Sequence, residues 1–137
     1  MRFAALALLL SACATSQALS PPERVLGCWV ERSELVTTTL NWSAGAEAGR
    51  VSGQLTTRNA RETVSLPLRL SGDEQNGWQV CGIPARDSCF VVAQGASGSL
   101  EGGRAFIDRY GERLHLSIVD GNGGDLVRFV GESAACS

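Results

Sequence analysis

Apolar and polar side chains alternate along two stretches of the chain. In residues 64–71, and again in residues 113–119, every second position is apolar. These apolar positions are Val64, Leu66, Leu68, Leu70, Leu114, Leu116 and Ile118. A period of two is typical of a β-strand with one face buried and the other in water. Pro67 has no N–H to donate, so we expect its strand to be at an edge, at a bulge, or unpaired at that residue.

Turn-forming clusters of glycine, asparagine, aspartate, serine and proline separate short strand-like segments. The predicted strands cover residues 25–32, 35–43, 49–57, 62–71, 77–83, 89–94, 103–109, 113–119 and 125–131. No amphipathic helix is predicted after the amino-terminal segment. This pattern predicts an all-β fold, an antiparallel up-and-down meander of eight or nine strands that forms a barrel or a sandwich. We favour the barrel, because an open meander would leave two long edges exposed to aggregation.

The amino-terminal segment has the features of an export signal. Arg2 is followed by an apolar run from Phe3 to Leu10 and then by small residues. The run is too short to cross a bilayer, which takes roughly 20 apolar residues. Leu10-Ser11-Ala12-Cys13 resembles the lipobox of bacterial lipoproteins. The resemblance implies that Cys13 receives a diacylglyceryl group, that the chain is cut before Cys13, and that the new amino terminus is acylated.

Three regions follow from this resemblance: a signal peptide (1–12), a lipidated cysteine with its tether (13–23), and one domain (24–137). Lipoproteins of this kind that stay in the inner membrane carry an aspartate after the cysteine, whereas this chain has Ala14. The expected location is therefore the outer membrane, facing the periplasm or the cell surface. Ordinary cleavage after Ala12, Ala14 or Ala18 is the alternative, and it would leave a soluble secreted protein.

Charge gives no sign of a nucleic-acid partner. The formal net charge of −2 becomes −3 when Arg2 is lost with the signal peptide, and acidic and basic residues are interspersed without runs. A domain of this size buries about two-thirds of its unfolded surface, so it has one modest core that disulfides would help to stabilise.

The cysteine count fits this picture, because five cysteines less a lipidated Cys13 leave four that can pair completely. Pairing is expected in an exported chain. Cys81 and Cys89 flank a predicted hairpin loop, whereas Cys28 and Cys136 belong to the first strand and to the segment just after the last. Those two strands are neighbours if the meander closes. Of the three possible connectivities, we favour Cys28–Cys136 with Cys81–Cys89. Zinc ligation would favour short paired spacings, which are absent, so no metal or cofactor is predicted.

A second resemblance begins at Gly27-Cys28-Trp29, which places Gly-x-Trp in the first predicted strand. This motif is similar to the opening of lipocalins and other calycins, where the tryptophan plugs the closed end of an up-and-down barrel. The resemblance implies a small calycin-like barrel with Gly27 and Trp29 as its structural motif. The chain length is closer to compact bacterial calycin-like domains, including periplasmic metalloprotease inhibitors. In those inhibitors a flexible amino-terminal segment enters the protease cleft, and here it would be Ala14 to Glu23.

Other residues that could carry chemistry have simpler structural interpretations. His115, the only histidine, lies on the polar face of a predicted strand and is expected to be a surface imidazole, even though Ser117 and Asp108 or Asp120 could surround it. No Gly-x-Ser-x-Gly elbow accompanies it. Two acidic pairs are expected to be solvated, and a glycine cluster is expected to form a hairpin turn. They are Glu31 with Glu34, Asp73 with Glu74, and Gly121, Gly123 and Gly124 with Asn122.

The large aromatic side chains are expected to fill the core. They are Trp29, Trp42, Trp78, Phe90, Phe106, Phe129 and Tyr110. A barrel of about eight strands can also hold one small ligand, and few aromatics are available to fill this one. The sequence therefore predicts a lipid-anchored, non-catalytic binding or interaction module, with a small apolar ligand or a protein partner. A periplasmic protease inhibitor is the first alternative, and a hydrolytic enzyme is the second.

Overall fold

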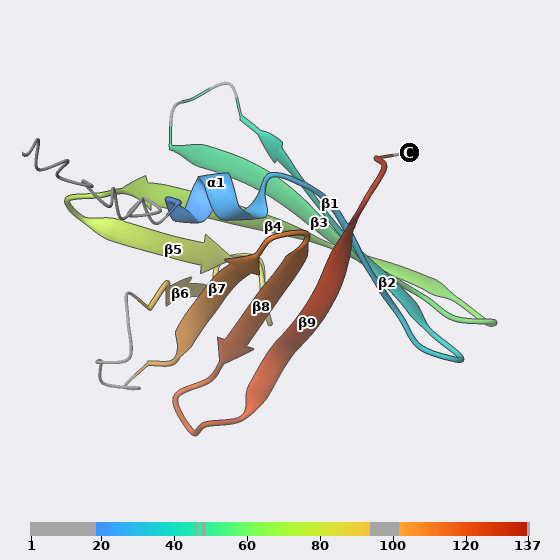
Figure 1. Cartoon of the computed structure of the whole chain (residues 1–137). Helices are drawn as coiled ribbons and strands as arrows, with labels where there is room; N and C mark the ends of the chain where they lie inside the picture. The colour runs from blue at the N-terminus through green and yellow to red at the C-terminus, as the bar shows by residue number, and fades with distance from the viewer. Residues whose placement is uncertain (1–18, 46, 48, 94–101, 137) are drawn as a thin grey trace, which may run out of the picture.

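The structure is a computed structural model, and it describes residues 19–45, 47, 49–93 and 102–136. These residues form one short helix and nine strands close to the predicted positions (Figure 1). The elements are α1 (Pro21–Val25), β1 (Gly27–Arg32), β2 (Thr37–Ala44), β3 (Arg50–Arg58), β4 (Thr63–Asp73), β5 (Gly77–Cys81), β6 (Cys89–Val91), β7 (Arg104–Tyr110), β8 (Arg113–Val119) and β9 (Asp125–Ala134). No helix among them has the length and apolar character that a membrane crossing requires. The all-β prediction is confirmed.

The strands form a single sheet that curls into a nearly closed barrel. Its order is β6-β5-β4-β3-β2-β1-β9-β8-β7, with antiparallel neighbours throughout. The two ends of this order meet at a parallel bridge between Val92 and Ala105, where the Ala93 N–H donates to the Ala105 carbonyl at 2.8 Å. An odd number of strands cannot alternate in direction all the way around a ring, so closure requires one parallel contact. The predicted adjacency of the first and last strands is confirmed, because β1 pairs with β9.

Alternate residues of the strands point into the barrel and form one hydrophobic core. Its buried aromatic side chains are Trp29, Trp42, Trp78, Phe90 and Phe129. The prediction that Phe106 and Tyr110 also fill the core is wrong. Both share the outer face of β7, where Tyr110 is 66% exposed, while Ala105 and Ile107 occupy the buried positions.

Helix α1 covers one end of the barrel and was not predicted. The Ser20 N–H donates to the Glu23 carboxylate at 3.0 Å, and Pro21 opens the first turn, where its missing N–H costs nothing. Val25, at the end of the helix, is completely buried. The predicted tether is therefore too long, because Pro21–Glu23 belong to the folded domain. Under the inhibitor alternative, the segment of this protein that enters a protease cleft would also be shorter, because α1 begins at Pro21.

The Trp29 side chain connects α1 to the barrel. It is 2% exposed, and its Nε1–H donates to the Val25 carbonyl at 2.8 Å. The Arg109 guanidinium carbon lies 5.1 Å from the centre of the Trp29 ring, which is a cation–π distance. Arg24 reaches from α1 to the Ile107 carbonyl at 3.1 Å. These contacts hold α1 over this end of the barrel, with Trp29 packed beneath it.

Both disulfides join the partners that the sequence favoured. Cys28 in β1 is bonded to Cys136, just after β9, with 5.3 Å between the Cα atoms. Cys81 and Cys89 face each other across the β5–β6 ladder, with 4.0 Å between the Cα atoms. The first bridge therefore holds the two ends of the domain together, and the second closes a hairpin.

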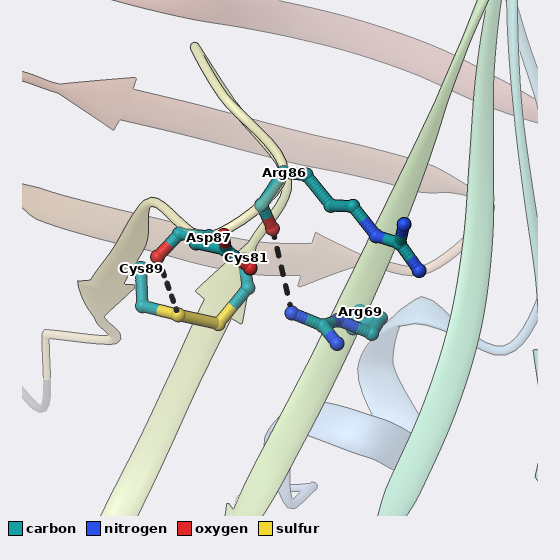
Figure 2. Close-up of a disulfide and its surroundings, with 5 residues drawn as sticks. All are labelled: Arg69, Cys81, Arg86, Asp87 and Cys89. Atoms are coloured by element: carbon teal, nitrogen blue, oxygen red, sulfur yellow. Dashed lines mark hydrogen bonds between the residues drawn. A yellow bond between two sulfur atoms is a disulfide. The ribbon is translucent and has the colours of Figure 1, made fainter.

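The hairpin bridge lies beside two arginines (Figure 2). The Arg69 guanidinium on β4 donates to the Arg86 carbonyl at 3.4 Å, which links β4 to the loop between β5 and β6. The Cys89 sulfur is 3.8 Å from the Asp87 carbonyl oxygen. A disulfide sulfur carries no proton to donate, so this contact is not a hydrogen bond. The surroundings of the bridge are those of a structural disulfide.

Candidate binding site at the open end of the barrel

Strand β4 continues past β5 at the end of the barrel opposite α1. β5 pairs only with Arg69–Asp73, whereas β3 pairs with β4 from Thr63 to Ser71. Figure 1 shows the hairpin ends of β1–β2 and β3–β4 projecting away from β7, β8 and β9. Pro67 lies in the part of β4 that β5 does not reach. The expectation that it would be unpaired is therefore confirmed on that side of the strand.

The inward face of β4 is uncovered beyond the end of β5. Leu68 and Leu70 are buried on this face, as the alternation predicts. Leu66 and Val64 continue the same face, but they are 39% and 46% exposed. Each of them lacks the side chains that a neighbouring strand would place over it. The barrel thus ends in an apolar surface on the inward face of β4.

The register of β1 to β4 shows which side chains surround this surface. A buried row crosses the four strands and ends at Leu66; it consists of Trp29, Leu40 and Leu55. The row two positions further out faces the same way and is less covered; it consists of Glu31, Thr38, Thr57 and Val64. We call Glu31, Thr38, Thr57, Val64 and Leu66 the open-end site. It combines two apolar side chains with two hydroxyls and one carboxylate.

Trp42 lies one row deeper than the open-end site. Its ring packs flat against Gly53 on β3, where an added Cβ would be 2.5 Å from a ring carbon. The side chain is 3% exposed, and its Nε1–H is buried without a hydrogen-bond partner in the described part of the chain. A buried donor without a partner costs about 1–3 kcal/mol. Sequence reasoning assigned Trp42 to the core but gave no signal of this unsatisfied donor.

His115 lies on the outer face of β8, as predicted. It is opposite Asp108 on β7, and Ser117 shares this face. Its ring meets the Tyr110 ring edge to face, with 5.4 Å between the centroids and 77° between the planes. Within the described residues, no hydrogen bond joins His115 to Asp108 or Ser117. The three residue types of a triad are therefore neighbours on a surface without the contacts that activate a nucleophile.

Replacing His115 with alanine is expected to change the free energy of unfolding by less than about 1 kcal/mol, because the change removes one cross-strand pair on an outer face. Urea denaturation followed by circular dichroism measures this change. The same variant should show the wild-type background rate with p-nitrophenyl acetate. A hydrolytic activity in the wild type that disappears with His115→Ala would contradict the non-catalytic interpretation.

Acidic residues at the turns have structural roles. In the β4–β5 turn, the Asp73 carboxylate accepts hydrogen bonds from the backbone N–H and the side-chain amide of Asn76. Both bonds lower the pKa of the Asp73 carboxyl, the backbone bond more than the side-chain bond. In the β8–β9 turn, the Asp120 carboxylate accepts the N–H groups of Asn122 and Gly124, both at 2.9 Å. The glycine cluster there is a hairpin turn, as predicted.

Glu31 has a contact that the sequence did not indicate. It was expected to be a solvated carboxylate beside Glu34, but its side chain accepts the backbone N–H of Val130 on β9. In the described ranges, no three His, Cys, Asp or Glu side chains are grouped as metal ligands. Cys13, the predicted lipidation site, lies outside the described residues.

Comparisons with protein families, with curated proteins and with solved structures found no match to this chain.

Proposed function

We propose that this protein is a lipid-anchored, non-catalytic binding module of the bacterial outer membrane, with a calycin-like barrel that holds a small apolar ligand. The observation that carries the proposal is the exposure of Leu66 and Val64 on the inward face of β4. Ligand sites in barrels are concave, mostly apolar, and supplied with a few polar groups. The open-end site has this composition, with Thr38, Thr57 and Glu31 beside the apolar residues.

The two ends of the barrel differ, so that one can be joined to the anchor while the other binds a ligand. Helix α1 and Trp29 close the end to which the amino-terminal segment is joined. A lipid on Cys13 would therefore connect to the barrel at its closed end. The open-end site lies at the other end, away from that connection. A module with this arrangement can be anchored and still accept a ligand.

A fluorescent apolar probe, N-phenyl-1-naphthylamine, tests ligand binding with the purified mature domain. We expect saturable fluorescence enhancement, and we expect Leu66→Glu to weaken it by about tenfold, because a charge would be placed on the apolar surface. Ser65→Glu is the matched control, since Ser65 is the exposed neighbour on the outer face of the same strand. Absence of saturable binding, or equal weakening by both variants, would contradict the proposal.

The anchor is tested separately in cells that produce the full chain. Cys13→Ser should abolish incorporation of labelled palmitate, because only the thiol accepts the diacylglyceryl group. The wild-type protein should appear in the outer-membrane fraction on a density gradient. Labelled palmitate in the variant band would rule out Cys13 as the lipidation site.

A further inference from the structure

Strand β9 separates from β1 over most of its length. The two strands pair only where Cys28–Val30 meet Glu132–Ala134. From Asp125 to Gly131, β9 is paired with β8 on its other side, and no described strand pairs with its free side. Figure 1 shows the two strands diverging from their crossing, β9 toward β7 and β8, and β1 toward its hairpin with β2. The barrel thus contains an open sheet edge.

The backbone groups on this edge can be identified from one contact. The Glu31 carboxylate accepts the Val130 N–H, so that N–H points away from β8. Alternate residues of an antiparallel strand point their N–H and C=O to the same side, so Arg128 directs both of its groups toward the open edge as well. The Glu31 carboxylate occupies the place where a neighbouring strand would supply a carbonyl oxygen. Such a carboxylate protects the edge while no strand is bound.

A shallow groove of about 450 Å³ lies on the outer surface at the point where β1 and β9 separate. Its lining side chains are Val30, Glu31, Arg32, Arg113, Val130 and Glu132. Arg113 pairs with Glu132 at 3.4 Å, and Glu31 is engaged by Val130. Arg32, and Arg128 next along the edge, have no ion pair within the described residues. Each of these two guanidinium groups can therefore form an ion pair with an acidic side chain.

We propose that the edge of β9 from Asp125 to Val130 binds an extended, acidic segment of a partner protein as an added β-strand. Unpaired N–H and C=O groups in a row are satisfied by another extended backbone, and adding a strand supplies one. Val30 and Val130 favour an apolar residue on the outer face of that strand. Arg32 and Arg128 favour acidic residues on the same face of that strand, two positions before and two positions after the apolar residue. Binding displaces Glu31 from the Val130 N–H.

The test uses the mature, folded domain and two acetylated heptapeptide amides. The acidic peptide is Thr-Asp-Thr-Val-Thr-Asp-Thr, which places its valine and both aspartates on one face of a strand, and the basic peptide has lysine in place of both aspartates. Binding is measured by calorimetry, and amide hydrogen exchange is followed by NMR. We expect the acidic peptide to bind and to slow exchange at Arg128, and the basic peptide to bind about tenfold more weakly or not at all.

Variants separate the edge from the charge. Arg128→Pro should abolish binding, because it removes the edge-directed N–H at a position where an edge strand tolerates proline. Arg128→Gln keeps the N–H but removes the charge, so it should weaken binding of the acidic peptide without abolishing it. Glu31→Ala should bind the acidic peptide about threefold or more tightly, because the Val130 N–H no longer has a competing acceptor.

Three outcomes would overturn the proposal. The first is unchanged exchange at Arg128 at a saturating concentration of the acidic peptide. The second is unchanged affinity in Glu31→Ala, which remains decisive if Arg128→Pro does not fold. The third is a dimer in sedimentation experiments in which exchange at Arg128 is already slow without peptide, because the edge would then bind a second copy of this chain. None of these outcomes depends on whether the open-end site binds the apolar probe.

Discussion

Replacing Trp29 with alanine is expected to lower the free energy of unfolding by about 3–5 kcal/mol. The side chain is 2% exposed, so the change leaves a large cavity between α1 and the barrel. It also leaves the Val25 carbonyl without its 2.8 Å hydrogen bond and removes the ring under the Arg109 guanidinium. Equilibrium denaturation in urea measures the loss, and a domain of this size could unfold from it.

Two phenylalanine variants separate burial from hydrogen bonding at the barrel tryptophans. Trp29→Phe keeps an aromatic ring but leaves the Val25 carbonyl unpaired, so it should cost about 1–3 kcal/mol more than the loss of ring volume alone. Trp42→Phe removes a buried N–H that has no partner in the described chain. The destabilisation caused by the smaller ring is therefore offset, because an unpaired N–H no longer has to be buried. Trp42→Phe should therefore be clearly the milder change. Equal costs would show that these two indole N–H groups do not differ as their surroundings indicate.

Removing the Cys28–Cys136 bridge by changing both cysteines to alanine is expected to destabilise the domain by about 4–5 kcal/mol under the chain-entropy account. The bridge joins residues that are 108 positions apart, and it reinforces a β1–β9 ladder of only three residue pairs. Without it, β9 can leave β1 and open the barrel. Chemical denaturation of the oxidised wild type and the double variant gives the difference.

The matched control is the double alanine variant at Cys81 and Cys89. This bridge spans only 8 positions, so the same account gives about 2–3 kcal/mol. The expected order of stability is therefore wild type, then the hairpin variant, then the variant without Cys28–Cys136. An equal loss in both variants would contradict a role for the long bridge in closing the barrel.

Local periodicity and turn chemistry were sufficient to predict the strands. Leu114, Leu116 and Ile118 alternate with polar residues, and only a strand places all three on one buried face. The β8–β9 turn follows from Asp120 and the glycines after it, because a short polar side chain and glycine form such a turn without help from the rest of the fold. The cysteine pairing followed from position, since the first and last strands of a closed meander must be neighbours.

Helix α1 carried a local signal that periodicity does not detect. Five residues are too few for a 3.6-residue pattern to appear, so the apolar and polar positions of Pro21–Val25 resemble those of a tether. The spacing of Ser20 and Glu23 around two prolines is the signature of a helix start. What holds this short helix in place is tertiary, because its buried Val25 and the Arg24 and Trp29 hydrogen bonds join it to the barrel.

The sequence by itself determined the strands, their order along the chain and the residues on each face, because these depend on neighbours within a few positions. Only the tertiary structure decided which of those faces are covered. Phe106 lies outside because Ala105 and Ile107 take the inward positions, and Leu66 is exposed because β5 ends before reaching it. The open edge of β9 likewise depends on where β1 turns away. Whether a strand face is buried depends on the relative lengths and twist of strands that are distant in sequence. A local sequence pattern therefore cannot predict it.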